Sequence, residues 1–180
     1  MEKQIESAYI QRILDGETKL FSIFVDNHSP SVYSLIAQII TSKEDAEELT
    51  QDVFVKAFEK LKTFKGDCSF STWIYRIAYN TAISHVRKKR IVFPFMDESL
   101  LENIEDETVD AFFEDENETR IRQLGNAIDR LNIEERTLIT LFYSNDKSIS
   151  EIALILDLSI ENVKVRLFRV RKKLFKLMTE

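Results

Sequence analysis

The fold is decided most clearly by residues 148–174, which read SISEIALILDLSIENVKVRLFRVRKKL. Ile149, Ile152, Ala153 and Leu156 stand three or four apart, a spacing that predicts a helix of about two turns with one buried face. The composition of the whole chain agrees, because three glycines and two prolines among 180 residues are few for a β-rich fold. We therefore expect an all-α protein.

A three-residue turn, Asp157-Leu158-Ser159, should separate this helix from a longer one. Aspartate tolerates a left-handed backbone conformation, and Ser159 can cap the helix that follows. The longer helix should bury the apolar residues Val163, Leu167, Val170 and Leu174. A short helix, a tight turn and a longer basic helix have the spacing of a helix-turn-helix motif.

The longer helix carries seven cations, Lys164, Arg166, Arg169, Arg171, Lys172, Lys173 and Lys176. The early ones can meet base edges in duplex DNA and the later ones phosphates. The expected contacts also include Ser159, Glu161, Asn162, Val165 and Phe168. Glu161 can accept a hydrogen bond from cytosine N4, and Val165 or Phe168 can touch thymine methyls. The alternative is a solvated basic helix ending a bundle, but the preceding capped helix and turn favour DNA binding.

Two further helices are expected upstream, near Ile121–Leu131 and Ile133–Tyr143. Asn132 and Ser148 each stand three residues before a glutamate, which is the form of a capping box. Residues 121–180 should therefore fold as one small helical domain.

The net charge of −6 is concentrated in one segment. Residues 91–120 hold 11 acidic residues and one arginine, whereas residues 1–90 and 121–180 carry net charges of +1 and +3. Helical periodicity is also lost in residues 91–120, and Pro94 stands near their start. We interpret residues 91–120 as an acidic linker, with room for short helical turns, between two small helical domains.

The N-terminal domain, residues 1–90, has its clearest helical pattern between Ser42 and Leu61. The apolar stripe of this helix comprises Ala46, Leu49, Val53, Phe54, Ala57, Phe58 and Leu61. After a break at residues 62–68, Ser69 or Ser71 can cap another helix. The buried face of that helix should comprise Trp73, Ile74, Ile77, Ala78, Ala82 and Val86. Upstream, residues 20–40 have further helical faces, which we expect to be interrupted near Asn27–Pro30.

Aromatic and basic side chains gather around the break at residues 62–68. They are Phe64, Phe70, Trp73 and Tyr75, with Lys65, Arg76 and the four cations Arg87, Lys88, Lys89 and Arg90. Rings of this kind can stack on unpaired bases while cations hold the backbone of a single strand. The alternative is that Phe70 and Trp73 are core residues, which we favour for Trp73.

Several classes of protein are disfavoured. No run of 18 apolar residues is present, and the N-terminus lacks the apolar core of a signal peptide. Cys68 is the only cysteine, and His28 and His85 have no flanking metal-ligand pattern. Glycine-rich phosphate-binding motifs are missing as well. We therefore expect a cytoplasmic protein without membrane insertion, catalytic site, cofactor or metal.

Two long stretches resemble extracytoplasmic-function (ECF) sigma factors. Residues 45–54, DAEELTQDVF, and 64–80, FKGDCSFSTWIYRIAYN, resemble conserved region two of that family. The helix-turn-helix through residues 163–171, VKVRLFRVR, resembles region four. The resemblance covers most of the chain in the right order. It implies a sigma factor that binds core RNA polymerase and directs initiation at promoters with −35 and −10 elements.

The resemblance also implies roles for named positions. Polymerase would bind Glu47, Glu48, Gln51 and Asp52, although an acidic solvated face is an equal alternative. The 64–72 loop and Asn80 match positions that capture bases flipped from the −10 element. The expected −10 contacts are Lys65, Asp67, Ser69, Phe70, Ser71, Arg76, Asn80, Arg87, Lys88, Lys89 and Arg90. The C-terminal domain would hold the −35 duplex, but the atypical Ile160-Glu161-Asn162 and Val165 mean that no −35 sequence is transferred.

Partners follow in the same way. Promoter DNA and core RNA polymerase are expected partners, an anti-sigma factor is a further candidate, and the free protein is expected to be a monomer. The acidic linker would mimic nucleic acid in the RNA path of the polymerase, or it is a partly disordered tether. Cys68 is expected to be a packing residue rather than a redox switch. The rival functions are a ligand-binding helix-turn-helix regulator and an adaptor that binds only protein.

Overall fold

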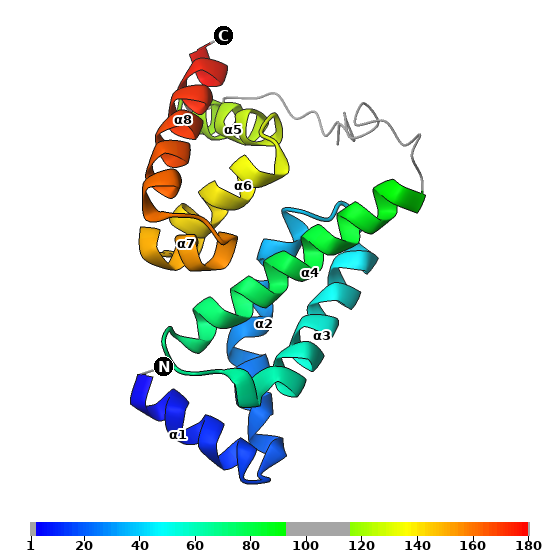
Figure 1. Ribbon diagram of the computed structural model, residues 1–180. Helices are drawn as coiled ribbons and strands as arrows, with labels where there is room; N and C mark the ends of the chain where they lie inside the picture. The colour runs from blue at the N-terminus through cyan, green and yellow to red at the C-terminus, as the bar shows by residue number, and fades with distance from the viewer. Residues whose placement is uncertain (1–2, 93–115, 180) are drawn as a thin grey trace.

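The computed structural model describes residues 3–92 and 116–179, and every secondary-structure element in these two ranges is helical (Figure 1). The all-α expectation is therefore confirmed for this part of the chain. Most of the expected linker lies outside the described residues, which also exclude the Arg90 side chain. At the edges of that linker, α4 continues to Val92 and α5 begins at Glu116.

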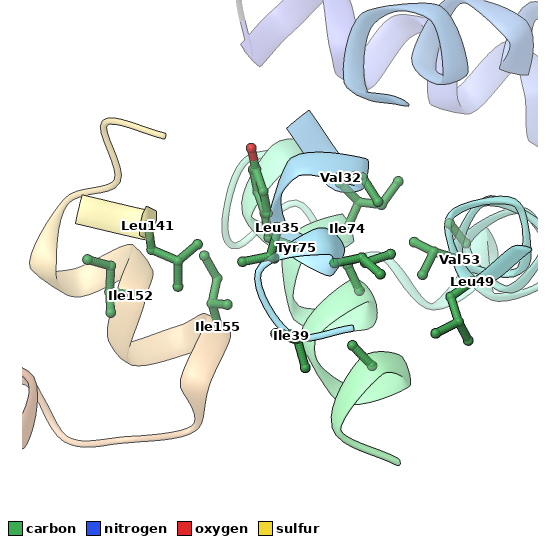
Figure 2. Packing of buried hydrophobic residues seen from close by; sticks show 14 of the residues in the cluster. Val32, Leu35, Ile39, Leu49, Val53, Ile74, Tyr75, Leu141, Ile152 and Ile155 are labelled. Carbon is green, nitrogen blue, oxygen red and sulfur yellow. The ribbon is translucent and has the colours of Figure 1, made fainter. Parts of the chain in front are cut away.

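The N-terminal domain is a bundle in which α2, α3 and α4 pack against one another. Its elements are α1 (Lys3–Leu14), η1 (Thr18–Leu20), α2 (Phe21–Ala37), α3 (Lys43–Lys60), η2 (Leu61–Thr63) and α4 (Phe70–Val92). Val32, Leu35, Val53 and Ile74 are fully or almost fully buried where these helices meet (Figure 2). This packing sets the separation and the facing sides of α3 and α4.

Helix α3 forms as the sequence predicts. The Ser42 side chain caps it by accepting a hydrogen bond from the Asp45 amide at 3.1 Å, and Glu44 and Asp45 lie in the first turn, where the helix dipole favours acids. The expected apolar stripe is buried except for Phe58, which is 40% exposed. The prediction for Phe58 was wrong because this ring lies at the edge of the stripe. It packs against Phe21 with the two ring centroids 5.1 Å apart.

The expected interruption near Pro30 is also absent, since α2 runs unbroken from Phe21 to Ala37. A proline inside a helix removes one backbone hydrogen bond and costs about 3 kcal/mol. Phe24 on one side of Pro30 and Val32, Leu35 and Ile36 on the other are all buried. Burial of these side chains outweighs the local cost, while Pro30 itself is exposed.

Helix α4 begins at the predicted cap. The Ser69 hydroxyl accepts a hydrogen bond from the Thr72 amide at 3.1 Å, and the buried Glu6 carboxylate of α1 accepts one from the Phe70 amide at 3.3 Å. Phe70 has no exposed surface, and its ring centroid lies 4.4 Å from that of Phe24 and 5.6 Å from that of Trp73. The burial of Phe70 therefore favours the core alternative over a direct contact with a base.

The C-terminal domain consists of short helices and one long one. Its elements are α5 (Glu116–Asp129), α6 (Ile133–Ile139), η4 (Thr140–Ser144), α7 (Ile149–Leu156) and α8 (Ile160–Thr179). Both predicted capping boxes are present, at Asn132 with Glu135 and at Ser148 with Glu151. They stabilise the starts of α6 and α7, which are too short to persist alone in water.

The helix-turn-helix is confirmed as α7 and α8. Asp157 ends α7 in a left-handed conformation, with φ 57° and ψ 47°. The Ser159 hydroxyl then accepts a hydrogen bond from the Asn162 amide at 3.2 Å, as expected for a helix cap. Val163, Leu167 and Val170 are buried and Leu174 packs against the same core.

The two domains touch. Helix α7 packs against α4, and Figure 1 shows α7 beside the N-terminal half of that helix. Buried residues of both domains belong to one hydrophobic cluster, in which Leu141, Ile152 and Ile155 face Leu35 and Tyr75 (Figure 2). None of the described helices is long and apolar enough to cross a membrane.

Candidate nucleic-acid interface

A groove lies between α3 and α4. It encloses about 580 Å³ and is open to solvent. Cations line it from both sides, Lys56 and Lys60 from α3 and Arg76 and Lys88 from α4. Asp52 is the sole acid among the lining residues. A groove with cations on both walls matches a negatively charged backbone that runs between the helices.

Polar and aromatic groups lie between these cations. Asn80 and Ser84 line the groove from α4, one turn apart. The Trp73 ring lines it as well, and this half-buried ring packs on Phe64 with a centroid distance of 5.2 Å. Trp73 is therefore both a core residue and a surface on which a base can stack. The sequence had favoured a core role alone for Trp73.

The predicted −10 residues do not all lie together. Arg76, Asn80 and Lys88 line the groove. Lys65 and Asp67 are exposed in the loop before α4, and Arg87 and Lys89 are exposed along α4. Ser69 is occupied as the cap of α4, and Ser71 accepts a hydrogen bond from Lys147 of the C-terminal domain at 2.7 Å. The structure thus divides the set between the groove, the loop before α4, the exposed surface of α4 and the contact between the domains.

Lys56 and Lys60 were not among the contacts predicted from the sequence. Asp52, Lys56 and Lys60 follow one another at intervals of four, so one face of the predicted helix carried a detectable signal. Which face of α3 turns toward α4 depends on the packing of the bundle, and the groove exists only because of that packing. Asp45 of α3 links the two helices near His85, because its Oδ2 lies 3.3 Å from Lys89 Nζ and 3.5 Å from His85 Nε2, both on α4.

The four residues expected to bind polymerase are all exposed on α3. Glu47 lies 3.9 Å from Lys43 in a weak surface ion pair, and Asp52 turns toward the groove. The exposed apolar side chains Val55 and Phe58 follow them on the same helix. Acidic and apolar groups together suit a protein partner better than DNA.

Helix α8 presents most of its predicted −35 contacts to solvent. Val165 is 46% and Phe168 is 69% exposed, and the other residues of that set on α8 are exposed as well. Two arginines are engaged within their own domain. Arg166 pairs with Glu134 at 2.8 Å, and Arg171 lies over the rings of Phe142 and Tyr143 at 5.2 and 5.6 Å. These contacts hold the two guanidinium groups in place beside the exposed face.

Comparison with known proteins matches both domains. Residues 24–91 match the Sigma-70 region 2 family, and residues 121–174 match the family of Sigma-70, region 4. The ECF RNA polymerase sigma-E factor of Escherichia coli (strain K12) is 31% identical over 178 residues, which cover 95% of this chain and 93% of that protein. The sigma-E factor of Haemophilus influenzae is 29% identical over 179 residues, covering 95% and 94% of the two chains.

The fold has a solved counterpart over nearly its whole length. The structure of CnrH in complex with the cytosolic domain of CnrY superposes with a TM-score of 0.69, at 21% identity, and covers 97% of each chain. The chain belongs to the ECF sigma factors, a family within the sigma-70 class. As such it directs promoter-specific transcription initiation together with core RNA polymerase.

Proposed function

We propose that the two faces described above divide the promoter between them. The groove between α3 and α4 holds the unpaired −10 strand, and the exposed face of α8 reads the −35 duplex. In this proposal residues 1–90 bind polymerase and the −10 element, residues 91–120 connect, and residues 121–180 bind the −35 element. The chain acts by binding alone, in the cytoplasm, and carries no catalytic site.

The groove is the single observation that carries the −10 assignment. Cations along both walls and an aromatic ring between them suit one unpaired strand, whose phosphates and bases they can hold at the same time. Lys56, Lys60 and Lys88 can neutralise phosphates, and Asn80 offers both a donor and an acceptor to a base edge. Phe70, which is buried, supports Trp73 and the loop from behind.

The polymerase is proposed to bind the exposed side of α3 that carries Glu47, Glu48 and Gln51. Acidic side chains beside exposed Val55 and Phe58 make this a protein-binding surface. The acidic linker remains open between mimicry of nucleic acid and a tether. Replacing several of its acids by serine or asparagine should weaken polymerase binding in a salt-dependent way if mimicry is correct.

The first experiment combines the purified chain with bacterial core RNA polymerase and a library of genomic fragments. Co-elution and initiation at specific promoters would support the assignment and yield the −35 and −10 sequences. Specific DNA binding by the chain alone, without affinity for polymerase, would instead indicate a helix-turn-helix regulator.

The polymerase face is tested by a pair of matched variants. Glu48→Lys should reduce affinity for core polymerase, because it reverses a charge on the proposed contact surface. Asp26→Lys makes the same reversal of charge at an exposed position of α2 and serves as the control. Equal loss in both variants would show a general electrostatic effect rather than a specific surface.

A further inference from the structure

Glu6 is a buried acid that the assignments above do not use. It lies in the first turn of α1, and its relative exposure is only 6%. Among the side chains that the structure describes, no other acid is buried. A carboxylate withdrawn from water is costly unless it finds charged or hydrogen-bonding partners. Its surroundings therefore indicate what holds Glu6 in the interior.

The partner of Glu6 is the start of α4. Glu6 Oε2 accepts a hydrogen bond from the Phe70 amide at 3.3 Å, and no lysine, arginine or histidine of the described residues forms an ion pair with it. Phe70 is the first residue of α4, where the unpaired amides and the helix dipole supply a partial positive charge. The end of the helix thus takes the place of a cation, and Glu6 satisfies an amide that has no carbonyl partner within the helix.

Helix α1 contacts both ends of the loop at residues 64–69 (Figure 1). It packs against η2, where this loop begins, and Glu6 binds Phe70, where the loop ends. Ile10 and Ile13 of α1 are buried in the core, so the helix is itself fixed. A loop that one anchored helix holds at both ends has fewer conformations available to it.

Glu6 and Ser69 hold the first turn of α4 in different ways. The Ser69 hydroxyl accepts from the Thr72 amide, and the Ser69 carbonyl accepts from the Trp73 amide, both at 3.1 Å. These contacts are local and form wherever the helix forms. The Glu6 contact comes from 64 residues away, so it ties this turn to the rest of the domain.

The turn that Glu6 holds carries the aromatic ring of the groove. Trp73 lines the groove, and its ring centroid lies 5.6 Å from that of Phe70 and 5.2 Å from that of Phe64. Phe64 also packs on Phe70, with the centroids 6.1 Å apart. A shift of the Phe70 backbone would therefore displace both rings, and with them one wall of the groove and the start of the loop.

We propose that Glu6 is a positioning residue for capture of the −10 strand. By holding the first amide of α4, it keeps Trp73 and the loop at residues 64–69 in the geometry that an unpaired base meets. Glu6 does not touch the strand itself, because it is buried. The proposal rests on the assignment of the −10 strand to the groove, and it adds α1 to the elements on which −10 recognition depends.

The test compares three variants of the full chain, after far-UV circular dichroism and urea denaturation have established which of them fold. Glu6→Leu removes the acceptor and keeps a side chain of similar size that suits a buried site. Glu6→Gln retains one acceptor oxygen. Thr50→Val is the matched control, because Thr50 is also 6% exposed in the same domain, and this change removes one buried hydrogen bond, from Thr50 Oγ1 to the Ala46 carbonyl at 2.7 Å.

Two properties are measured for each variant. The first is binding of a single-stranded oligonucleotide that carries the −10 sequence from the promoter selection above, at several salt concentrations. The second is the fluorescence of Trp73, the sole tryptophan of the chain. Glu6→Leu should shift the Trp73 emission and weaken binding about three to ten times, the range for loss of one helix-capping hydrogen bond.

The other readouts separate positioning from a general loss of stability. The slope of log affinity against log salt should not change in Glu6→Leu, because every cation of the groove remains. Glu6→Gln should recover most of the affinity, and Thr50→Val should match the parent in affinity and emission.

The outcomes distinguish this proposal from the −10 assignment. Unchanged affinity and emission in Glu6→Leu, in a parent that binds the oligonucleotide, would overturn the role of Glu6 and leave the −10 assignment intact. Equal losses in Glu6→Leu and Thr50→Val, or a smaller salt slope in Glu6→Leu, would overturn it as well. If Glu6→Leu does not fold, Glu6→Asp takes its place, because its carboxylate is one methylene shorter and is withdrawn from the Phe70 amide. If the parent does not bind the oligonucleotide, the −10 assignment fails and the positioning role fails with it.

Discussion

Arg76 and Asp157 form an ion pair at 3.2 Å although 81 residues separate them in the chain. Arg76 lies on α4, where it lines the proposed path of the −10 strand. Asp157 is the left-handed residue of the helix-turn-helix turn. The pair therefore connects the two elements that we propose to bind DNA, and it places the turn of the C-terminal domain against the N-terminal one.

The conformation of Asp157 predicts a strict preference at this position. Asp157→Val should lower the free energy of unfolding by about 1–2 kcal/mol, because a β-branched residue is strained at positive φ. Asp157→Gly should change it by less than half of that, since glycine adopts the same conformation freely. Urea denaturation of both variants checks this. Equal destabilisation by glycine and valine would assign the effect to the lost ion pair instead.

Lys56 and Lys60 on the groove wall should contribute to the salt dependence of −10 strand binding. Lys56→Gln and Lys60→Gln should each weaken binding of a single-stranded −10 oligonucleotide and reduce the slope of log affinity against log salt by about 0.7. Lys19→Gln, an exposed lysine before α2, is the control and should leave the slope unchanged. If the slope stays the same in both groove variants, the placement of the −10 strand in the groove is contradicted.

The burial of Phe70 predicts a structural role. Phe70→Ala should destabilise the N-terminal domain by about 3–5 kcal/mol, because it leaves a cavity beside Phe24 and Trp73. Phe168→Ala, which truncates a 69% exposed ring, should change stability by no more than about 0.5 kcal/mol. Thermal unfolding of the two variants measures the contrast. If the Phe70→Ala variant is as stable as the parent but binds the −10 oligonucleotide more weakly, Phe70 contacts a base directly instead.

His28 predicts a dependence of stability on pH. Burial first, and then the positive charge of Lys147, hold the pKa of His28 below its ordinary value of 6.5, and its buried Nε2 has no hydrogen-bond partner among the described residues. The unfolded chain therefore binds a proton more readily than the folded one. Stability should be complete above pH 6.5 and should fall as the pH drops from 6.5 toward the lower pKa of the folded state.

His28→Leu should flatten this part of the profile. The measurement is the free energy of unfolding of parent and variant between pH 7.5 and 5, and the difference between the two curves isolates the histidine. Lys147→Met should reduce the same pH dependence in part, because it removes the positive charge that is the second cause of the lowered His28 pKa. Parallel curves for parent and His28→Leu would contradict the assignment.

The exposed face of α8 predicts a change of sequence preference. Glu161 is exposed at the start of the helix, where a side chain can reach base edges in the major groove. Glu161→Ala should relax selection at one base pair of the −35 element, by about 1–3 kcal/mol of discrimination. Selection of −35 sequences by the holoenzyme, parent against variant, measures this. An unaltered preference would exclude Glu161 from base recognition.

Much of the local structure could be predicted from the sequence because its causes are local. The capping boxes at Asn132 and Ser148, the cap at Ser69 and the left-handed Asp157 depend on neighbours three or four residues away. The apolar periodicity of α3, α7 and α8 identified their buried faces for the same reason. One local rule failed where it met the packing of the core, because the proline did not break α2. Packing also decided between the two alternatives for Phe70, whose side chain is buried in the core.

Residue spacing, charge and motifs were therefore enough to predict most of the helices, the helix-turn-helix, the uneven distribution of charge and the family. Tertiary packing is what brings Lys56 and Lys60 into one groove with Arg76 and Asn80, and what brings Lys147 to Ser71 across the domain boundary. The physical reason is that a helix acquires its facing partners when it packs. Periodicity specifies which side of a helix is buried, but the burial of a shared core specifies which element lies opposite.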